Sequence, residues 1–321
     1  MNEGIGAAGI REDDVAPVRS ATQSAQQIVA AMPRLILEAR RAAASVFHGT
    51  HGRRRAGPGE NFWQYRRFND GEPATRVDWR RSARDDHLYV REREWEASHT
   101  VWIWPDLSPS MVFASPLVWE TKRDRALVLA FALGELLVRG GERVAIPGMM
   151  RPTANRNVIE RMAEAIIHHS GDWQSLPPPV TPGPRDEIVL LSDFWNPSAE
   201  ITASVEYMSK RGCGGHLVQV VDPAEETFPY AGRIDFREPE TGANLMVGRA
   251  ELWARDYLKR VTLHRSAIAA ETSRHGWSFA IHRTDRPASE LLIALHARMG
   301  ESRDVLSRKR VTAKLGEWEA A

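Results

Sequence analysis

The chain has a single cysteine, Cys213, in 321 residues. One thiol excludes a disulfide framework within the chain and is typical of proteins from reducing compartments. An excess of charge of one sign is also missing, since 43 Lys and Arg residues stand against 42 Asp and Glu residues. The overall charge therefore gives no reason to expect nucleic acid or an anionic membrane as a partner.

Long apolar runs are absent as well. The longest candidate, ALVLAFALGELLV at 126–138, is shorter than the roughly 20 residues that span a bilayer. Residues 1–20 are polar and rich in Gly and Ala, without the apolar core of an export signal. We therefore expect a cytoplasmic protein without a membrane span.

Several catalytic motifs are missing. There is no GxxxxGK[ST] loop, so any ATP hydrolysis would be the work of a partner. No GxSxG elbow surrounds Ser108 or Ser110, which argues against a serine hydrolase. His168 and His169 lack the spacing of a zinc motif, and Cys213 is expected to be a passive small residue.

Strand patterns alternate with helix patterns from about residue 99. Buried strands are expected at 99–106, 142–148, 186–194, 214–223 and 277–285. Helices are expected at 120–141, 155–169, 196–212, 249–274 and 287–299, with a hairpin at 228–248. The pattern of the first of these helices is strongly amphipathic. This order predicts an α/β domain over 99–300 with a doubly wound, largely parallel sheet.

Four further segments flank this domain. We expect disordered or charged tails at 1–20 and 301–321 and an N-terminal helix over 21–48, which Pro33 should kink or divide. An Arg- and Trp-rich subdomain is expected over 49–98. Most of its tryptophans, with those at 102, 104 and 119, are expected in a core between this subdomain and the sheet.

Polar side chains follow two of the buried strands. Asp106, Ser108 and Ser110 come after the first strand, and Asp193 comes after a later one. Ligands of such sheets bind beyond the carboxyl ends of the strands. Carboxylates and hydroxyls at that edge suit Mg²⁺, although the same residues are also common helix caps.

Asp-x-Ser-x-Ser in this position resembles the metal-ion-dependent adhesion site of von Willebrand factor A domains. The resemblance implies that Asp106, Ser108, Ser110 and Asp193 are metal ligands. It also implies a threonine from the loop before the second helix, for which Thr153 is the candidate and Asn155 the substitute.

The segment 57–96 mixes arginines and aromatic residues with enough acids to make a phosphate-binding surface improbable. Its order, GENFW, then RRFNDGEPATRVDW, SAR and LYVRERE, resembles the signature of the bacterial family catalogued as domain of unknown function 58. The signature residues that we single out are Arg76, Asp78, Trp79, Arg84, Arg91 and Glu94.

This family resemblance implies a von Willebrand factor A-like domain that works with a MoxR-type AAA+ ATPase in the maturation or assembly of protein complexes. We therefore expect a non-enzymatic, Mg²⁺-dependent interaction module. The alternatives are a metal-dependent hydrolase or nuclease using Asp106 and Asp193, and a scaffold without metal.

Overall fold

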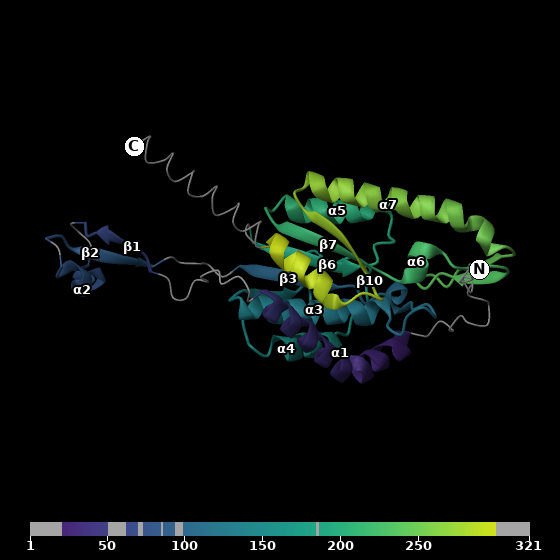
Figure 1. Ribbon diagram of the computed structural model, residues 1–321, viewed down its shortest axis with the longest axis horizontal. Coiled ribbons are helices and arrows are strands. Elements are labelled where there is room, and N and C mark those ends of the chain that lie inside the picture. The colour runs from purple at the N-terminus through teal and green to yellow at the C-terminus, as the bar shows by residue number, and fades with distance from the viewer. Residues whose placement is uncertain are drawn as a thin grey trace, which may run out of the picture. The chain divides into compact units, whose positions relative to one another are not determined.

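The computed structural model describes residues 21–50, 62–69, 73–84, 86–93, 99–183 and 186–299. It divides into two units (Figure 1). The smaller unit is Thr50–Ser98, and the larger contains the rest of the chain, Met1–Gly49 and His99–Ala321.

A six-stranded sheet forms the centre of the larger unit. Its strand order is β10-β7-β6-β3-β4-β5, and all neighbouring strands are parallel except the edge pair β4 and β5. The largely parallel α/β sheet expected from the sequence is thus confirmed. The strands are β3 (Thr100–Pro105), β4 (Arg143–Ile146), β5 (Met150–Thr153), β6 (Glu187–Ser192), β7 (Gly214–Val221) and β10 (Ser278–Arg283).

Helices cover both faces of this sheet (Figure 1). Helices α1 (Ala21–Thr50), α3 (Lys122–Arg139) and α4 (Val158–Ile167), with a last helix at 288–299, share one apolar core. Helices α5 (Ser198–Ser209) and α7 (Ala254–Arg274) pack on the other face. The sheet is therefore buried on both sides, which explains why its strands are continuous apolar runs.

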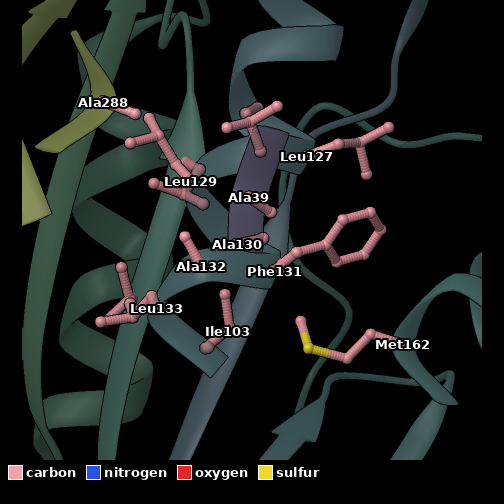
Figure 2. Close-up of a cluster of buried hydrophobic side chains, with 14 of the residues drawn as sticks. Ala39, Ile103, Leu127, Leu129, Ala130, Phe131, Ala132, Leu133, Met162 and Ala288 are labelled. Atoms are coloured by element: carbon pink, nitrogen blue, oxygen red, sulfur yellow. The ribbon is translucent and has the colours of Figure 1, made fainter. Parts of the chain in front are cut away.

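Helix α3 is buried almost all round, which corrects the amphipathic pattern expected for 120–141. Fourteen of its residues are buried, because α1 covers the side that would otherwise face water. Figure 2 shows Leu127, Phe131 and their neighbours against Ala39 of α1 and Met162 of α4. A helix in this position can carry a charged side chain only if that charge finds a partner.

Helix α1 belongs to the larger unit and runs through Pro33 without a break. The expected division at this proline is wrong. Proline removes one backbone donor, but an apolar stripe holds both halves of the helix on the common core. The stripe consists of Ile28, Met32, Leu35, Ala39, Ala43 and Val46.

Two short elements and a hairpin follow β7. Helix α6 (Pro223–Thr227) comes first, then the antiparallel strands β8 (Ile234–Arg237) and β9 (Asn244–Val247), as expected for 228–248, and the 3₁₀ turn η4 (Ala250–Trp253). Phe228, Ile234, Val247 and Ala250 form a small apolar cluster beneath the hairpin.

The smaller unit pairs β1 (Phe62–Arg67) with β2 (Tyr89–Arg93) in antiparallel fashion. Between them lie the 3₁₀ turn η2 (Ala74–Arg76) and helix α2 (Trp79–Ser82). The Asp78 side chain accepts a hydrogen bond from the Arg81 amide at 3.0 Å and so caps α2. The Arg81 guanidinium lies over the Tyr89 ring, 4.6 Å from its centroid.

The tryptophans that were expected in a core between the Arg- and Trp-rich subdomain and the sheet differ in burial within their own units. Trp104 is buried, while Trp102 is half-buried and donates its indole N–H to Asp186 Oδ2 at 2.9 Å. Trp79 and Trp119 are exposed. The side chains of Trp63 and Trp95 lie outside the described residues. None of the helices in the described ranges is long and apolar enough to cross a membrane.

Close packing between β7 and Trp277 makes a direct test of this core. A Cβ atom added at Gly215 would lie 2.4 Å from the Trp277 ring, whereas one added at Gly214 would lie 3.8 Å from its nearest neighbour. We expect Gly215→Ala to lower the free energy of unfolding by about 1–3 kcal/mol, because the ring must move. Gly214→Ala should change it little. Urea denaturation of both variants measures this difference, and equal stabilities would contradict the packing.

Candidate functional site

The two aspartates singled out in the sequence lie at the carboxyl edge of the sheet, after adjacent strands. Asp106 follows β3, and its amide donates to the Leu191 carbonyl of β6 at 2.8 Å. Asp193 follows β6. Both side chains are buried. They lie close enough together that the charge of Asp193 raises the pKa of Asp106. The sheet therefore brings together two carboxylates that are 87 positions apart in sequence.

Asp106 is held by its own loop and by β6. Its Oδ1 accepts from the Ser108 amide at 2.8 Å, and its Oδ2 accepts from the Ser192 hydroxyl at 2.6 Å. The hydroxyls of Ser108 and Ser110 are 3.2 Å apart and bond to each other. Burial, and secondly the charge of Asp193, raise the pKa of Asp106 to about 7.

A buried lysine occupies the centre of the acidic edge. Lys122, in the first turn of α3, places Nζ 2.8 Å from Asp193 Oδ2 and 2.7 Å from Glu225 Oε1 of α6. Burial by itself would lower the pKa of Lys122, but the two carboxylates outweigh burial and raise it above its ordinary value. The ammonium group is therefore a built-in cation of this site.

A second layer of hydrogen bonds fixes Asp193 and Glu225. The Trp195 indole donates to Glu225 Oε1 at 3.1 Å, and the side-chain amide of Gln219 donates from Nε2 to the Asp193 backbone carbonyl at 2.8 Å. Phe194, which lies between Asp193 and Trp195 in the sequence, is fully buried and has a left-handed backbone conformation at φ 51°. A bulky residue in this conformation is strained, so the surrounding contacts must hold the turn after β6 in place.

Thr153 does not belong to this site, which corrects the expectation from the sequence. It lies on the edge strand β5, paired with Val144, which in turn pairs with Val101. Val101 lies near the start of β3, five residues before Asp106. At ~3.3 Å per residue, Thr153 is therefore displaced from Asp106 by about 16 Å along the strand direction. Thr153 accepts a hydrogen bond from the Asn155 amide instead, so Asn155 is its neighbour at the far edge.

These residues do not fit the magnesium site that the sequence predicts. Thr153, the ligand expected from the loop before the second helix, is at the opposite edge of the sheet, and Asp193 is already neutralised by the Lys122 ammonium. A divalent cation beside that ammonium would meet a positive charge at close range. Asp106, Ser108, Ser110 and Asp193 do come together, but as parts of an internally bonded cluster.

Two exposed features surround the cluster. The Ser110 amide donates to Glu240 Oε1 at 3.2 Å, so the tip of the β8–β9 hairpin contacts the loop after β3. The loop 113–121 then leads to α3 and is fixed from below by the Ser115 amide, which donates to the buried Asp222 Oδ2 at 2.7 Å. At its surface Leu117 is half exposed and Trp119 fully exposed.

The remaining candidates from the sequence lie elsewhere. Asp78 is the cap of α2, while Trp79 and Arg84 are exposed on the smaller unit. The side chains of Arg76 and Arg91, and the whole of Glu94, lie outside the described residues. Cys213 is buried, and burial raises the pKa of its thiol to about 12, which makes it a poor nucleophile.

Sequence reasoning missed Lys122 and Glu225, which complete the site. Lys122 stood in the charged start of an expected amphipathic helix, TKRDRA, where a lysine normally faces water. The unbroken apolar run that follows Lys122 could have indicated its burial, because such a run is typical of a helix that is buried on all sides.

Replacing Lys122 tests the built-in cation. We expect Lys122→Met to lower the free energy of unfolding by about 3–5 kcal/mol, because Asp193 and Glu225 remain buried without a counter-charge. Lys210→Met is the control, since Lys210 forms a surface pair with Glu206 and should change stability little. Urea denaturation measures both.

The wild type and Lys122→Met also test the exclusion of magnesium. Millimolar Mg²⁺ or EDTA should leave the melting temperature of the wild type unchanged, whereas Mg²⁺ should raise that of Lys122→Met by neutralising the freed carboxylates. A wild type that Mg²⁺ stabilises would restore the metal site.

Asp106 should make stability depend on pH. A carboxyl whose folded pKa is raised to about 7 stabilises the fold while it is protonated, and this contribution is lost as the pH rises from about 4 through about 7. Asp106→Asn keeps the neutral shape, so its stability relative to the wild type should increase over that range and then level off. Urea denaturation at several pH values measures the difference. Parallel curves for the two proteins would contradict a raised pKa.

Comparison with known proteins agrees with the family signature found in the sequence. The chain is 25% identical over 284 residues to uncharacterized proteins of Mycobacterium bovis and Mycobacterium tuberculosis, covering 81% of this chain and 86% of each relative. Two solved structures match 64% of this chain and all of their own. They are an aerotolerance-related membrane protein from Bacteroides fragilis (18% identity, TM-score 0.36) and the conserved hypothetical protein BatB from Bacteroides thetaiotaomicron (13%, TM-score 0.35). The family described as protein of unknown function DUF58 matches residues 64–267, and the chain belongs to this family.

Proposed function

We propose that this protein is a non-enzymatic binding module with a von Willebrand factor A-like domain, which works with a MoxR-type AAA+ ATPase in the assembly or maturation of protein complexes. The observation that carries the proposal is a fully exposed tryptophan, Trp119, on a loop that is hydrogen-bonded to Asp222, next to an acidic cluster whose charges are paired internally. The module binds without a metal ion.

The bonding of the acidic cluster supports binding over catalysis. Asp193 is neutralised by Lys122, and Asp106 accepts hydrogen bonds from Ser108 and Ser192. A general base needs a free lone pair within reach of substrate, and a two-metal hydrolase needs carboxylates that are free to bind cations. The hydrolase alternative therefore has less support than the scaffold without metal.

The loop 113–121 supports a protein partner. Its hydrogen bonds to Asp222 and within Ser115–Val118 fix the backbone, so binding orders few additional residues. Exposed tryptophans that fill a partner's pocket contribute more than most other residues to the affinity of interfaces. Leu117 adds apolar area on the same loop.

The choice of partner comes from the family resemblance and from a missing motif. The signature over 57–96 resembles proteins that are encoded beside MoxR-type AAA+ ATPases, and this chain has no P-loop of its own. An ATPase would then supply the energy, and this chain would recognise the ATPase, its client complex or both.

Removing the indole tests the proposal. We expect Trp119→Ala to weaken binding of the purified chain to the MoxR-type ATPase of its own host at least about tenfold, since hot-spot tryptophans contribute about 2 kcal/mol or more. Tyr207→Ala on α5 is the control, because Tyr207 is also exposed but lies on another element. Isothermal titration calorimetry measures both affinities, and circular dichroism checks that both variants fold. Equal affinities of Trp119→Ala and the wild type would place the contact elsewhere.

A further inference from the structure

A groove of about 380 Å³ lies between the edge strand β10 and the last helix, 288–299. Its apolar lining comes from both elements, with Ala280 and Ile281 on the strand and Leu291, Ala294 and Leu295 on the helix. Ile281 is 43% exposed, which is unusual for a large apolar residue in a sheet covered on both faces. The groove belongs to the larger unit alone.

The outer edge of β10 is open. This strand ends the sheet and pairs only with β7 among the described strands. Just after the strand, the Thr284 amide donates inward to the Val221 carbonyl at 2.9 Å. Because backbone N–H groups alternate in direction along a strand, those of Phe279, Ile281 and Arg283 point outward. An extended segment could therefore extend the sheet along this edge.

Charge at the groove favours an acidic occupant. The exposed Arg286 and Arg298 line it, and neither guanidinium has a carboxylate partner among the described residues. Arg283 differs, since it pairs with Asp285 at 2.6 Å and with Glu226 at 3.6 Å. Glu290 is a third lining residue whose charge is not paired within the described ranges, so two available cations stand against one anion.

The lining also contains a polar atom without a partner. His282 is 4% exposed, and its Nε2 makes no hydrogen bond within the described part of the chain. Buried polar atoms are normally bonded, so this nitrogen is an exception among the described residues.

We propose that this groove binds an extended, acidic segment of a partner protein, which adds to β10 as a further strand. The segment's backbone would accept from the outward N–H groups, including that of Ile281. Its apolar side chains would pack on the exposed Ile281 and Ala294, and its carboxylates would pair with Arg286 and Arg298. This surface is distinct from the Trp119 loop and does not depend on the proposed ATPase partner.

The probe is a fluorescein-labelled peptide in which glutamate alternates with valine, and its partner probe has lysine in place of glutamate. Fluorescence anisotropy with the full chain should show saturable binding of the glutamate peptide and at least about tenfold weaker binding of the lysine peptide, which lacks two charge-assisted bonds. Equal binding of both peptides, or no binding of either, would overturn the proposal.

Two sets of variants locate the binding. Arg286→Glu combined with Arg298→Glu should reverse the preference of the chain toward the lysine peptide, since both residues are exposed and replaceable without repacking. Ile281→Pro removes the outward donor, while Ile281→Thr keeps it. The proline variant should lose affinity and the threonine variant should retain it, at melting temperatures close to that of the wild type.

If Ile281→Pro unfolds, the test rests on the double variant Arg286→Glu and Arg298→Glu. A double variant that still prefers the glutamate peptide would overturn the proposal. Trp119→Ala should bind the glutamate peptide as the wild type does. The outcome at the groove is therefore independent of the outcome for the ATPase, because the two assays use different probes and different residues.

Discussion

The burial of one ammonium group between two carboxylates organises this fold. Lys122 opens α3, Asp193 follows β6, and Glu225 lies in α6. A single cluster therefore joins the main helix of one face to the turn after β6 and to α6, at the carboxyl edge of the sheet. Each of these charges would be strongly destabilising alone in the interior, and together they compensate one another only in the correct geometry. The cluster therefore contributes to the positions of these elements as much as to their stability.

The surrounding contacts depend on that geometry. Glu225 also forms a capping box with Asp222 at the start of α6. Asp222 Oδ1 accepts from the Ala224 amide within this cap, and Asp222 Oδ2 accepts from the Ser115 amide. Through these bonds the loop that carries Trp119 is connected to the buried cluster. The strained backbone of Phe194 is retained because contacts hold it on both sides. The neighbouring Asp193 is fixed by Lys122, and His264 Nε2 donates to the Phe194 carbonyl at 2.7 Å.

A rigid edge of this kind suits recognition better than chemistry. The polar groups that would perform catalysis are used to hold loops in place, and the apolar groups that would normally be buried, Trp119 and Leu117, are displayed. The groove at β10 offers a different kind of contact, with an open strand edge and available arginines. Under the two proposals made above, these surfaces would hold two different partners.

The sequence alone determined the sheet and the position of its two aspartates. Five of its strands are apolar runs flanked by turns, and such runs are buried wherever they pair. The strand β5 was missed because MRPT is short and contains a proline, and its formation depends on pairing with β4. For the same reason Thr153 was assigned to the wrong edge of the sheet.

Only the tertiary structure decided what the aspartates do. Lys122 lies 71 positions from Asp193 and 103 from Glu225, and nothing in the local pattern links them. Whether a lysine in the first turn of a helix faces water or the interior depends on which other elements cover that helix. Here α1 and the sheet cover it, and the charge had to be paired inside. Local patterns fix strands and helices, whereas the partner of a buried charge is fixed by packing between distant segments.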